Sequence, residues 1–137
     1  MTLERFRLLC LQQPGATEQI QWGADAVFKV GGKMFAVACT DAAYPGAKAC
    51  SFKCDDEGFA ELCEREGVVP APYLARAKWV ALDRWDALSD REIVTSVAAA
   101  YAIVRGGLPK KVQAALAATP AAAKARPAKS AKTRVRR

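Results

Sequence analysis

The pair Gly31-Gly32 constrains the fold more than any other feature, because it separates two segments with alternating apolar residues. A two-residue type I′ turn needs positive φ at both central positions, which glycine adopts without steric cost. Segments 26–30 and 33–39 are therefore predicted to form a β-hairpin. Strict alternation puts one set of side chains of the second strand on a single face: Phe35, Val37 and Cys39.

Short apolar segments on both sides extend this hairpin into an antiparallel meander. The predicted strands are Gln19–Trp22, Ala26–Val30, Lys33–Cys39 and Ala49–Cys54, followed by extended segments at Val68–Ala71 and Lys78–Leu82. Helical periodicity predicts one helix before the strands, a second opening at Asp55, and two more at the end of the folded part. This order is typical of an α+β fold with two layers, in which helices pack on one face of the meander sheet.

The third helix has the clearest local signals. Ser89 and Glu92 have the spacing of a capping box, and Leu88 and Ile93 that of a hydrophobic staple. The apolar stripe predicted to be buried consists of Ile93, Val97, Tyr101 and Val104. Gly106-Gly107 is expected to end this helix, and Leu108-Pro109 to begin the last one, because proline is favoured in a first turn.

The net positive charge is confined to one end of the chain. The sequence has 21 basic and 14 acidic residues, a formal charge of +7. Residues 117–137 hold seven of the basic residues and none of the acidic ones, so residues 1–116 carry no net charge. This last segment has Val135 as its one large apolar side chain, too little to offset its conformational entropy. We predict a folded domain, 1–116, and a basic tail, 117–137, that is disordered when unbound.

The absence of histidine excludes Ser-His-Asp and Cys-His catalysis and any metal site with histidine ligands. The five cysteines are odd in number and lack CxxC spacing, so we expect reduced structural thiols. A redox or metal role for Cys50 and Cys54 is the open alternative. We therefore predict a binding protein with no catalytic residue, no metal site and no cofactor.

The sequence also bears on where the protein works. The first residues carry charges where a secretory signal needs an apolar stretch. The longest apolar run, 93–104, is too short to span a bilayer. We expect a cytoplasmic protein that does not bind membranes.

Several blocks resemble the MmcQ/YjbR family. Thr17–Phe35 is similar to its opening hairpin, and Ser51–Cys54, before an acidic helix start, to its second block. Three stretches match its later blocks: Gly67–Tyr73, Trp79-Val80 and Leu108–Lys111. The resemblance covers residues 3–113 in the same order and leaves the tail outside. It implies a fold similar to CyaY/frataxin, of the double-wing DNA-binding type.

Basic residues in two regions are candidates for phosphate contacts. Those in the tail are Lys124, Arg126, Lys129, Lys132, Arg134, Arg136 and Arg137; those in the domain are Lys29, Lys33, Lys53, Arg76, Lys78, Lys110 and Lys111. Cations that neutralise phosphates release condensed counterions, which gives affinity that is independent of base sequence and falls with salt. The expected partner of a monomer is DNA, with RNA as the alternative, bound at low specificity. The hairpin would act as a wing.

Two other interpretations remain open for the domain. Its lysines and arginines are balanced by 14 carboxylates and can be ordinary solvated charges. The sheet face or the loop Pro70–Tyr73 can instead bind a protein or a small ligand, as in a regulatory module.

The sequence also contains aromatic and acidic clusters that are candidates for further sites. Aromatics can stack on bases, but strand aromatics are more often core, which is our prediction for Trp22, Phe28, Phe35 and Phe52. Tyr73 and Trp79, near Arg76, are the expected exceptions. The second helix holds a cluster of carboxylates: Asp55, Asp56, Glu57, Glu61, Glu64 and Glu66. Frataxin's acidic iron-binding ridge lies on its first helix, so capping and solvation explain this cluster and no iron site is predicted.

Overall fold

A computed structural model describes residues 1–21, 25–41, 47–72 and 74–117. The elements in these ranges are α1 (Leu3–Leu11), β1 (Thr17–Gln21), β2 (Asp25–Val30), β3 (Lys33–Cys39), β4 (Cys50–Lys53), α2 (Asp56–Leu62), β5 (Val68–Pro70), the 3₁₀ turn η1 (Ala75–Ala77), β6 (Trp79–Leu82), α3 (Asp90–Gly106) and α4 (Lys110–Ala117). Their order agrees with the prediction. The expectations for Trp22, Tyr73 and the tail from residue 118 onward lie outside the described residues.

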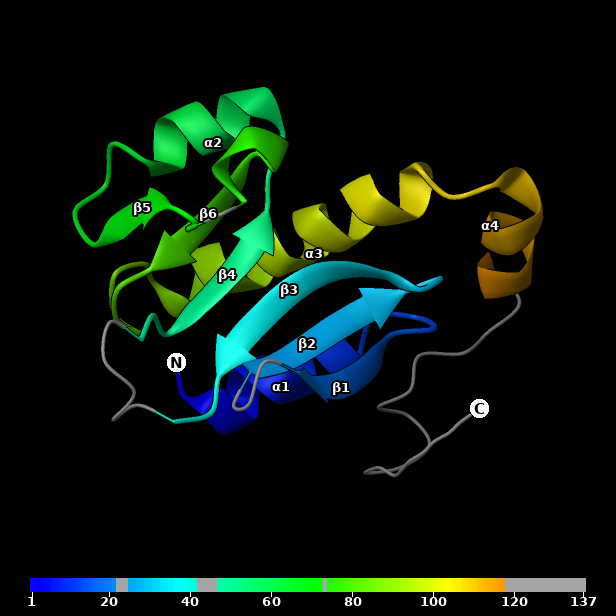
Figure 1. The fold of residues 1–137 in the computed structure, drawn as a ribbon, viewed down its shortest axis with the longest axis horizontal. Coiled ribbons are helices and arrows are strands. Elements are labelled where there is room, and N and C mark those ends of the chain that lie inside the picture. Colours follow the sequence, from blue (N-terminus) through cyan, green and yellow to red (C-terminus); the bar gives the residue numbers. More distant parts are fainter. Residues whose placement is uncertain (22–24, 42–46, 73, 118–137) are drawn as a thin grey trace.

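The strands form one sheet in the order β1-β2-β3-β4-β6-β5, and every pairing is antiparallel. The first four strands are the predicted meander, while β6 pairs with β4 and leaves β5 at the edge. In Figure 1 the sheet faces the viewer, α1 and α3 lie behind it, and α2 stands beside β5 and β6. The two-layer α+β fold is therefore confirmed.

The main core lies between the sheet and α1 and α3. Its largest fully buried side chains include Phe6, Phe28, Phe35, Phe52 and Ile93. Edge-to-face packing, a favourable aromatic geometry, joins Phe6 to Phe28 and Phe35 to Tyr101, with ring centroids 6.1 and 5.6 Å apart. The predicted core positions in the strands and α3 are confirmed, except that Val104 is only half-buried.

A β-bulge places Phe35 in this core. Phe28 pairs with Ala36 and the next residue, Lys29, with Met34, so Phe35 is the extra residue of β3. Phe35 therefore lies on the helix side with Ala36, whereas Val37 belongs to a cluster on the opposite face. The prediction that Phe35 and Val37 share a face is wrong, because strict alternation does not hold across a bulge.

The face of the sheet away from α1 and α3 is also partly apolar. Val27, Val37, Trp79 and Ala81 form a small buried cluster there, and Leu74 packs against it. Trp79 is only 3% exposed. Its prediction as an exposed, base-stacking exception is wrong, because the chain before β6 returns over this face.

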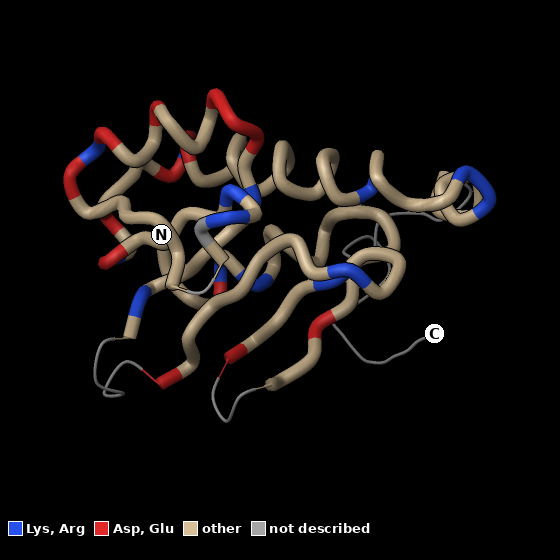
Figure 2. The backbone as a smooth tube through the Cα atoms, turned by 45° about the horizontal axis from the view of Figure 1, so that its top comes forward, with Lys and Arg blue, Asp and Glu red and all other residues tan. Residues whose placement is uncertain are grey.

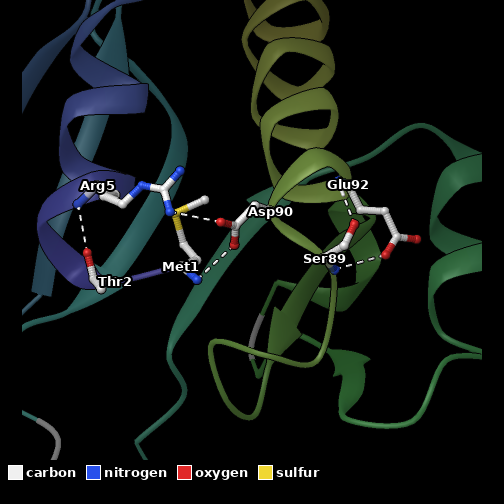
Figure 3. A network of polar contacts seen from close by, with 6 residues as sticks. All are labelled: Met1, Thr2, Arg5, Ser89, Asp90 and Glu92. Atoms are coloured by element: carbon white, nitrogen blue, oxygen red, sulfur yellow. Dashed lines mark hydrogen bonds and ion pairs between the residues drawn. The ribbon is translucent and has the colours of Figure 1, made fainter.

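The first turns of α1 and α3 are joined by ion pairs (Figure 3). The Asp90 carboxylate forms ion pairs with the amino group of Met1 and with the guanidinium of Arg5, each with an N–O distance of 2.8 Å. The predicted capping box is present, since the Ser89 hydroxyl accepts from the Glu92 backbone N–H and the Glu92 carboxylate accepts from that of Ser89. These contacts fix where α3 starts, and its 17 residues extend about 25 Å toward α4.

The β2–β3 hairpin and α4 are packed together at the other end of α3. Gly31 and Gly32 have φ of 58° and 81°, as the predicted turn requires. A Cβ on Gly31 would lie 2.6 Å from Cδ1 of Leu108, and one on Gly15 only 2.2 Å from Cδ2 of Leu116. Glycine at these two turns therefore lets α4 pack directly on the backbone next to the hairpin.

Candidate nucleic-acid interface

The β2–β3 hairpin presents two of the predicted lysines. Lys29 is half-buried on β2, and its ammonium donates to Oε1 of Gln19 on β1 at 3.0 Å. Lys33 is exposed at the start of β3, directly after the Gly31-Gly32 turn. The hairpin therefore carries positive charge at its tip, as the wing interpretation requires.

Lys110 and Lys111 lie close to this tip. They form the first turn of α4 and are both exposed. Leu108, just before them, contacts Gly31 of the hairpin turn. Residues far apart in the sequence thus form one basic region, which we call the basic end: Lys29, Lys33, Lys110 and Lys111. Figure 2 shows blue segments at the hairpin and at the start of α4.

The lysines of α4 oppose the local helix electrostatics. The N-terminus of a helix carries partial positive charge, which favours acidic residues in the first turn. α4 has no acidic residue there and begins with two lysines. The helix gains no stability from these charges, so their position needs another explanation.

Ion pairing separates the basic end from the other basic residues. Arg5, Arg7, Lys48, Arg65 and Arg84 each contact a carboxylate. Among the described residues, none of the seven candidate lysines and arginines of the domain makes such a pair. Arg91 and Arg105 are the two other basic residues of this part of the chain that lack a carboxylate partner. The candidate positions therefore keep their positive charge available to an anion.

Lys53 extends the basic region toward the centre of the molecule. It is half-buried at the end of β4, and its ammonium donates to the backbone carbonyl of Ala77. Lys33 and Lys53 line the same open hollow, between the hairpin, η1 and the end of α3. The structure thus brings these two predicted residues together.

Arg76 and Lys78 occupy different surroundings. Arg76 is exposed on η1. Lys78 has a φ of 64°, and its ammonium lies 5.1 Å from the centre of the Phe59 ring on α2. Its carbonyl accepts from the backbone N–H of Cys54 at 2.9 Å. Lys78 therefore has a structural role beside α2 and does not belong to the basic end.

Arg105 is a basic residue that sequence reasoning missed. It lies in the last turn of α3 and donates to the carbonyl of Gln113 on α4 at 3.2 Å. A basic residue in the last turn of a helix is favoured by the helix dipole. The sequence therefore gives no reason to expect that Arg105 also contacts α4. Its contact with α4 becomes visible only once that helix is known to fold back.

The cysteines have the environment of structural thiols. Cys10, Cys50 and Cys54 are buried, and no disulfide joins the five. Burial raises the pKa of Cys50 well above that of a free thiol and that of Cys54 to about 12. A thiol protonated at neutral pH is a poor nucleophile and a poor metal ligand. Within the described residues, no three Cys, Asp or Glu side chains gather in a way that could hold a metal ion.

Acidic side chains gather on α2, away from the basic end. Figure 2 shows the positions of acidic residues as red segments of the backbone along this helix. The Asp55 carboxylate caps α2 by accepting from the backbone N–H of Gly58 at 2.7 Å, and Asp56 and Glu57 lie in its first turn. The charges of the domain are thus balanced in number, but its acidic cluster and its basic end lie on different elements.

These observations define a small α+β domain with a six-stranded antiparallel sheet and a basic end formed by a hairpin and α4. The sequence model of the YjbR family matches residues 11–103, about two thirds of the chain, so the protein belongs to the YjbR family. A comparison with curated proteins found no match. The match includes the hairpin and Lys53 but not Lys110, Lys111 or the tail.

A helix that spans a membrane must be long and predominantly apolar, and the helices in the described part of the chain can be judged by this requirement. None of them is long and apolar enough to cross a bilayer.

Proposed function

We propose that this protein binds nucleic acid through its phosphates, at the basic end and through the basic tail, and that it is not an enzyme. The observation that carries the proposal is the pairing pattern. Five of the ten basic residues elsewhere in the domain are matched to carboxylates, whereas all four at the hairpin and α4 make no ion pair and are gathered at one place. The last residue of α4, Ala117, opens the segment with seven more basic residues.

The two parts have different roles in this proposal. The tail supplies most of the affinity, because each neutralised phosphate releases counterions whatever the base sequence. The hairpin lysines and the first turn of α4 sit on a rigid scaffold and orient the domain on the backbone. The expected ligand is DNA, bound by a monomer at low sequence specificity, with RNA as the alternative.

Salt-dependent binding tests the role of the basic end. Affinity for a fluorescent DNA duplex is measured by anisotropy at several salt concentrations, with the full chain and the variant K33Q/K111Q. Each lost phosphate contact lowers the slope of log K against log[salt] by about 1, so the variant is expected to lose about 2. A duplex RNA of equal length shows whether DNA is preferred.

A matched control removes the same charge elsewhere. Arg84 and Arg91 are exposed and lie before and at the start of α3, at the opposite end of this helix from α4. The variant R84Q/R91Q should keep the slope of the unmodified chain. Equal losses in both variants would show that only net charge matters and would refute a defined basic end. Failure of the unmodified chain to bind at low salt would refute the proposed function itself.

A further inference from the structure

The basic end adjoins an open apolar hollow that phosphate binding alone does not use. The hollow has a volume of about 420 Å³. It is lined on one side by Met34 and Trp79 and on the other by Val104 and Leu108. Lys33 and Lys53 lie at its border. A surface that contacts only a duplex backbone has no need of an apolar floor beside its lysines.

The hollow lies where the two apolar clusters of the domain meet. Met34 and Leu74 pack against the cluster on the far face of the sheet, and Val104 and Leu108 belong to the core on the helix side. Neither cluster closes this end of the sheet. Met34, Leu74 and Val104 are left half-buried here, so apolar surface remains in contact with solvent.

Small residues keep the hollow open. Gly107, at the end of α3, and Ala77, at the end of η1, both line it and are both exposed. A Cβ on Gly107 would come no closer than 3.6 Å to another atom. The opening therefore depends on side chains that are short, which makes it easy to fill by substitution.

We propose that this hollow receives an unpaired nucleobase while Lys33 and Lys53 hold the adjoining phosphates, so that the protein prefers single strands. This inference rests on the proposed function and names the form of nucleic acid that the site takes. Charge complementarity identifies the ligand: a nucleotide joins a flat, largely apolar ring to an anion, and the site joins an apolar floor to two ammonium groups that make no ion pair, although that of Lys53 donates to the Ala77 carbonyl. Ligand pockets start at about 300 Å³, which makes the hollow adequate for one base.

The preference for single strands follows from geometry. In a duplex the bases are paired and stacked, and placing one in a pocket costs a few kcal/mol of unstacking. In a single strand that cost is small, and contact between a base and protein contributes to affinity largely independently of base identity. The inferred site therefore discriminates between paired and unpaired nucleic acid without reading sequence.

An abasic strand provides the sharpest test, because it carries the same phosphates without bases. Anisotropy is measured for a 12-nucleotide thymidine strand and an abasic strand of the same length, both labelled, with the full chain. We expect the thymidine strand to bind about tenfold more tightly, at the lower part of the range for contacts of one base. The substitution Ala77→Trp fills the hollow and should bring the two affinities together without weakening the abasic complex. Ala60→Trp, at an exposed position on α2, is the matched control and should keep the difference.

Two outcomes overturn the inference in distinguishable ways. Equal binding of thymidine and abasic strands by the unmodified chain would refute the base site and leave the proposed function intact. Binding of neither strand would refute both the base site and the proposed function. A second measurement does not depend on a variant. The methyl NMR signals of Met34 and Val104 should shift with the thymidine strand and stay in place with the abasic strand, and the reverse or an equal shift would contradict the inference.

Discussion

The basic end and the acidic helix α2 carry opposite charges for different reasons. The acidic residues at the start of α2 satisfy local electrostatics, since Asp55 caps the helix and Asp56 and Glu57 lie near its positive end. The lysines of α4 contradict the same rule, because Lys110 and Lys111 occupy the positive end of their helix. Folding therefore explains these three acidic residues and does not explain the lysines.

This difference shows why net charge is a poor guide to the domain. Residues 1–116 have no net charge, yet the acidic cluster of α2 and the lysines of the basic end lie on different elements. A position that breaks a local rule without a structural gain is where function is expected. By that criterion the basic end is a functional candidate and α2 is not.

The largest expected effect comes from the tail, whose charge adds to that of the basic end. Replacing its seven basic residues with glutamine in the full chain should weaken binding to duplex DNA at least about 100-fold at low salt. The slope of log K against log[salt] should fall by about 3.6 to 6, for four to seven lost contacts. Anisotropy in a salt series measures both quantities.

A charge-preserving control accompanies this variant. K124R/K129R/K132R keeps every positive charge of the tail and should bind like the unmodified chain. A loss of less than threefold on removing all seven charges would mean that the basic end binds without the tail.

The second prediction concerns the contact that assembles the basic end. The substitution Gly31→Ala places a methyl group 2.6 Å from Cδ1 of Leu108 and adds strain at a φ of 58°. Gly32→Ala has a similar strain, with φ of 81°, but its Cβ has no neighbour within 4 Å. We expect both variants to be less stable, and G31A to lose about 1–3 kcal/mol more than G32A because of overpacking.

Urea unfolding of the two alanine variants measures that difference. Equal midpoints would show that α4 does not depend on its contact with the hairpin. A DNA-binding slope reduced in G31A but not in G32A would show in addition that the two halves of the basic end act together.

Much of this fold could be predicted from sequence, because its signals are local. The turn at Gly31-Gly32 and the capping box at Ser89 depend on residues next to each other, and both are confirmed. In contrast, the face on which Phe35 lies is set by a bulge, and Trp79 is buried because the chain before β6 returns over the sheet. Such features arise from tertiary packing, which overrides alternation and local polarity.

The candidate site was predictable residue by residue but not as a surface. Lysines at the hairpin and at the start of α4 could be named from sequence, whereas their proximity depends on Leu108 packing on Gly31. The hollow could not be foreseen at all, since its walls come from elements far apart in the chain. Lys78 was also named from the sequence as a phosphate contact, but in the structure its ammonium lies over the Phe59 ring, apart from the basic end.

The third prediction separates stability from binding. K110Q/K111Q removes two positive charges from the positive end of α4 and should leave stability unchanged or raise it by up to about 0.5 kcal/mol. The same variant should weaken binding to DNA several-fold. D56N/E57Q makes the corresponding change on α2 and should lower stability without weakening binding. Urea unfolding and anisotropy on the same four samples, with the unmodified chain and R84Q/R91Q as references, measure both properties.

Opposite signs for stability and binding in K110Q/K111Q are the decisive result. If this variant loses stability as D56N/E57Q does, its lysines have a structural role, and the contrast between the two regions disappears.

The smallest effect is expected at the start of α3, where Glu92 lies at the opposite end of this helix from α4. Hydrogen bonds from Arg65 and from the backbone and hydroxyl of Ser89 lower the pKa of Glu92 to about 2, below its usual value of 4.5. A carboxyl whose pKa is lower in the folded state stabilises the fold above its unfolded pKa and loses this contribution as pH falls. The melting temperature should therefore decline between about pH 4.5 and pH 2, with a further share from Asp90, whose pKa is lowered by Met1 and Arg5.

The variant E92Q isolates the contribution of Glu92. Glutamine at this position still completes a capping box, but it does not titrate, so the decline in melting temperature over this pH range should become shallower. E64Q removes one carboxylate that makes no ion pair among the described residues and leaves the Arg65–Glu92 contact in place. Thermal unfolding followed by circular dichroism from pH 6 to pH 2 compares the three proteins. An unchanged slope in E92Q would mean that acid sensitivity arises elsewhere, and α3 would then be held by its packing on the sheet and not by the charges at its first turn.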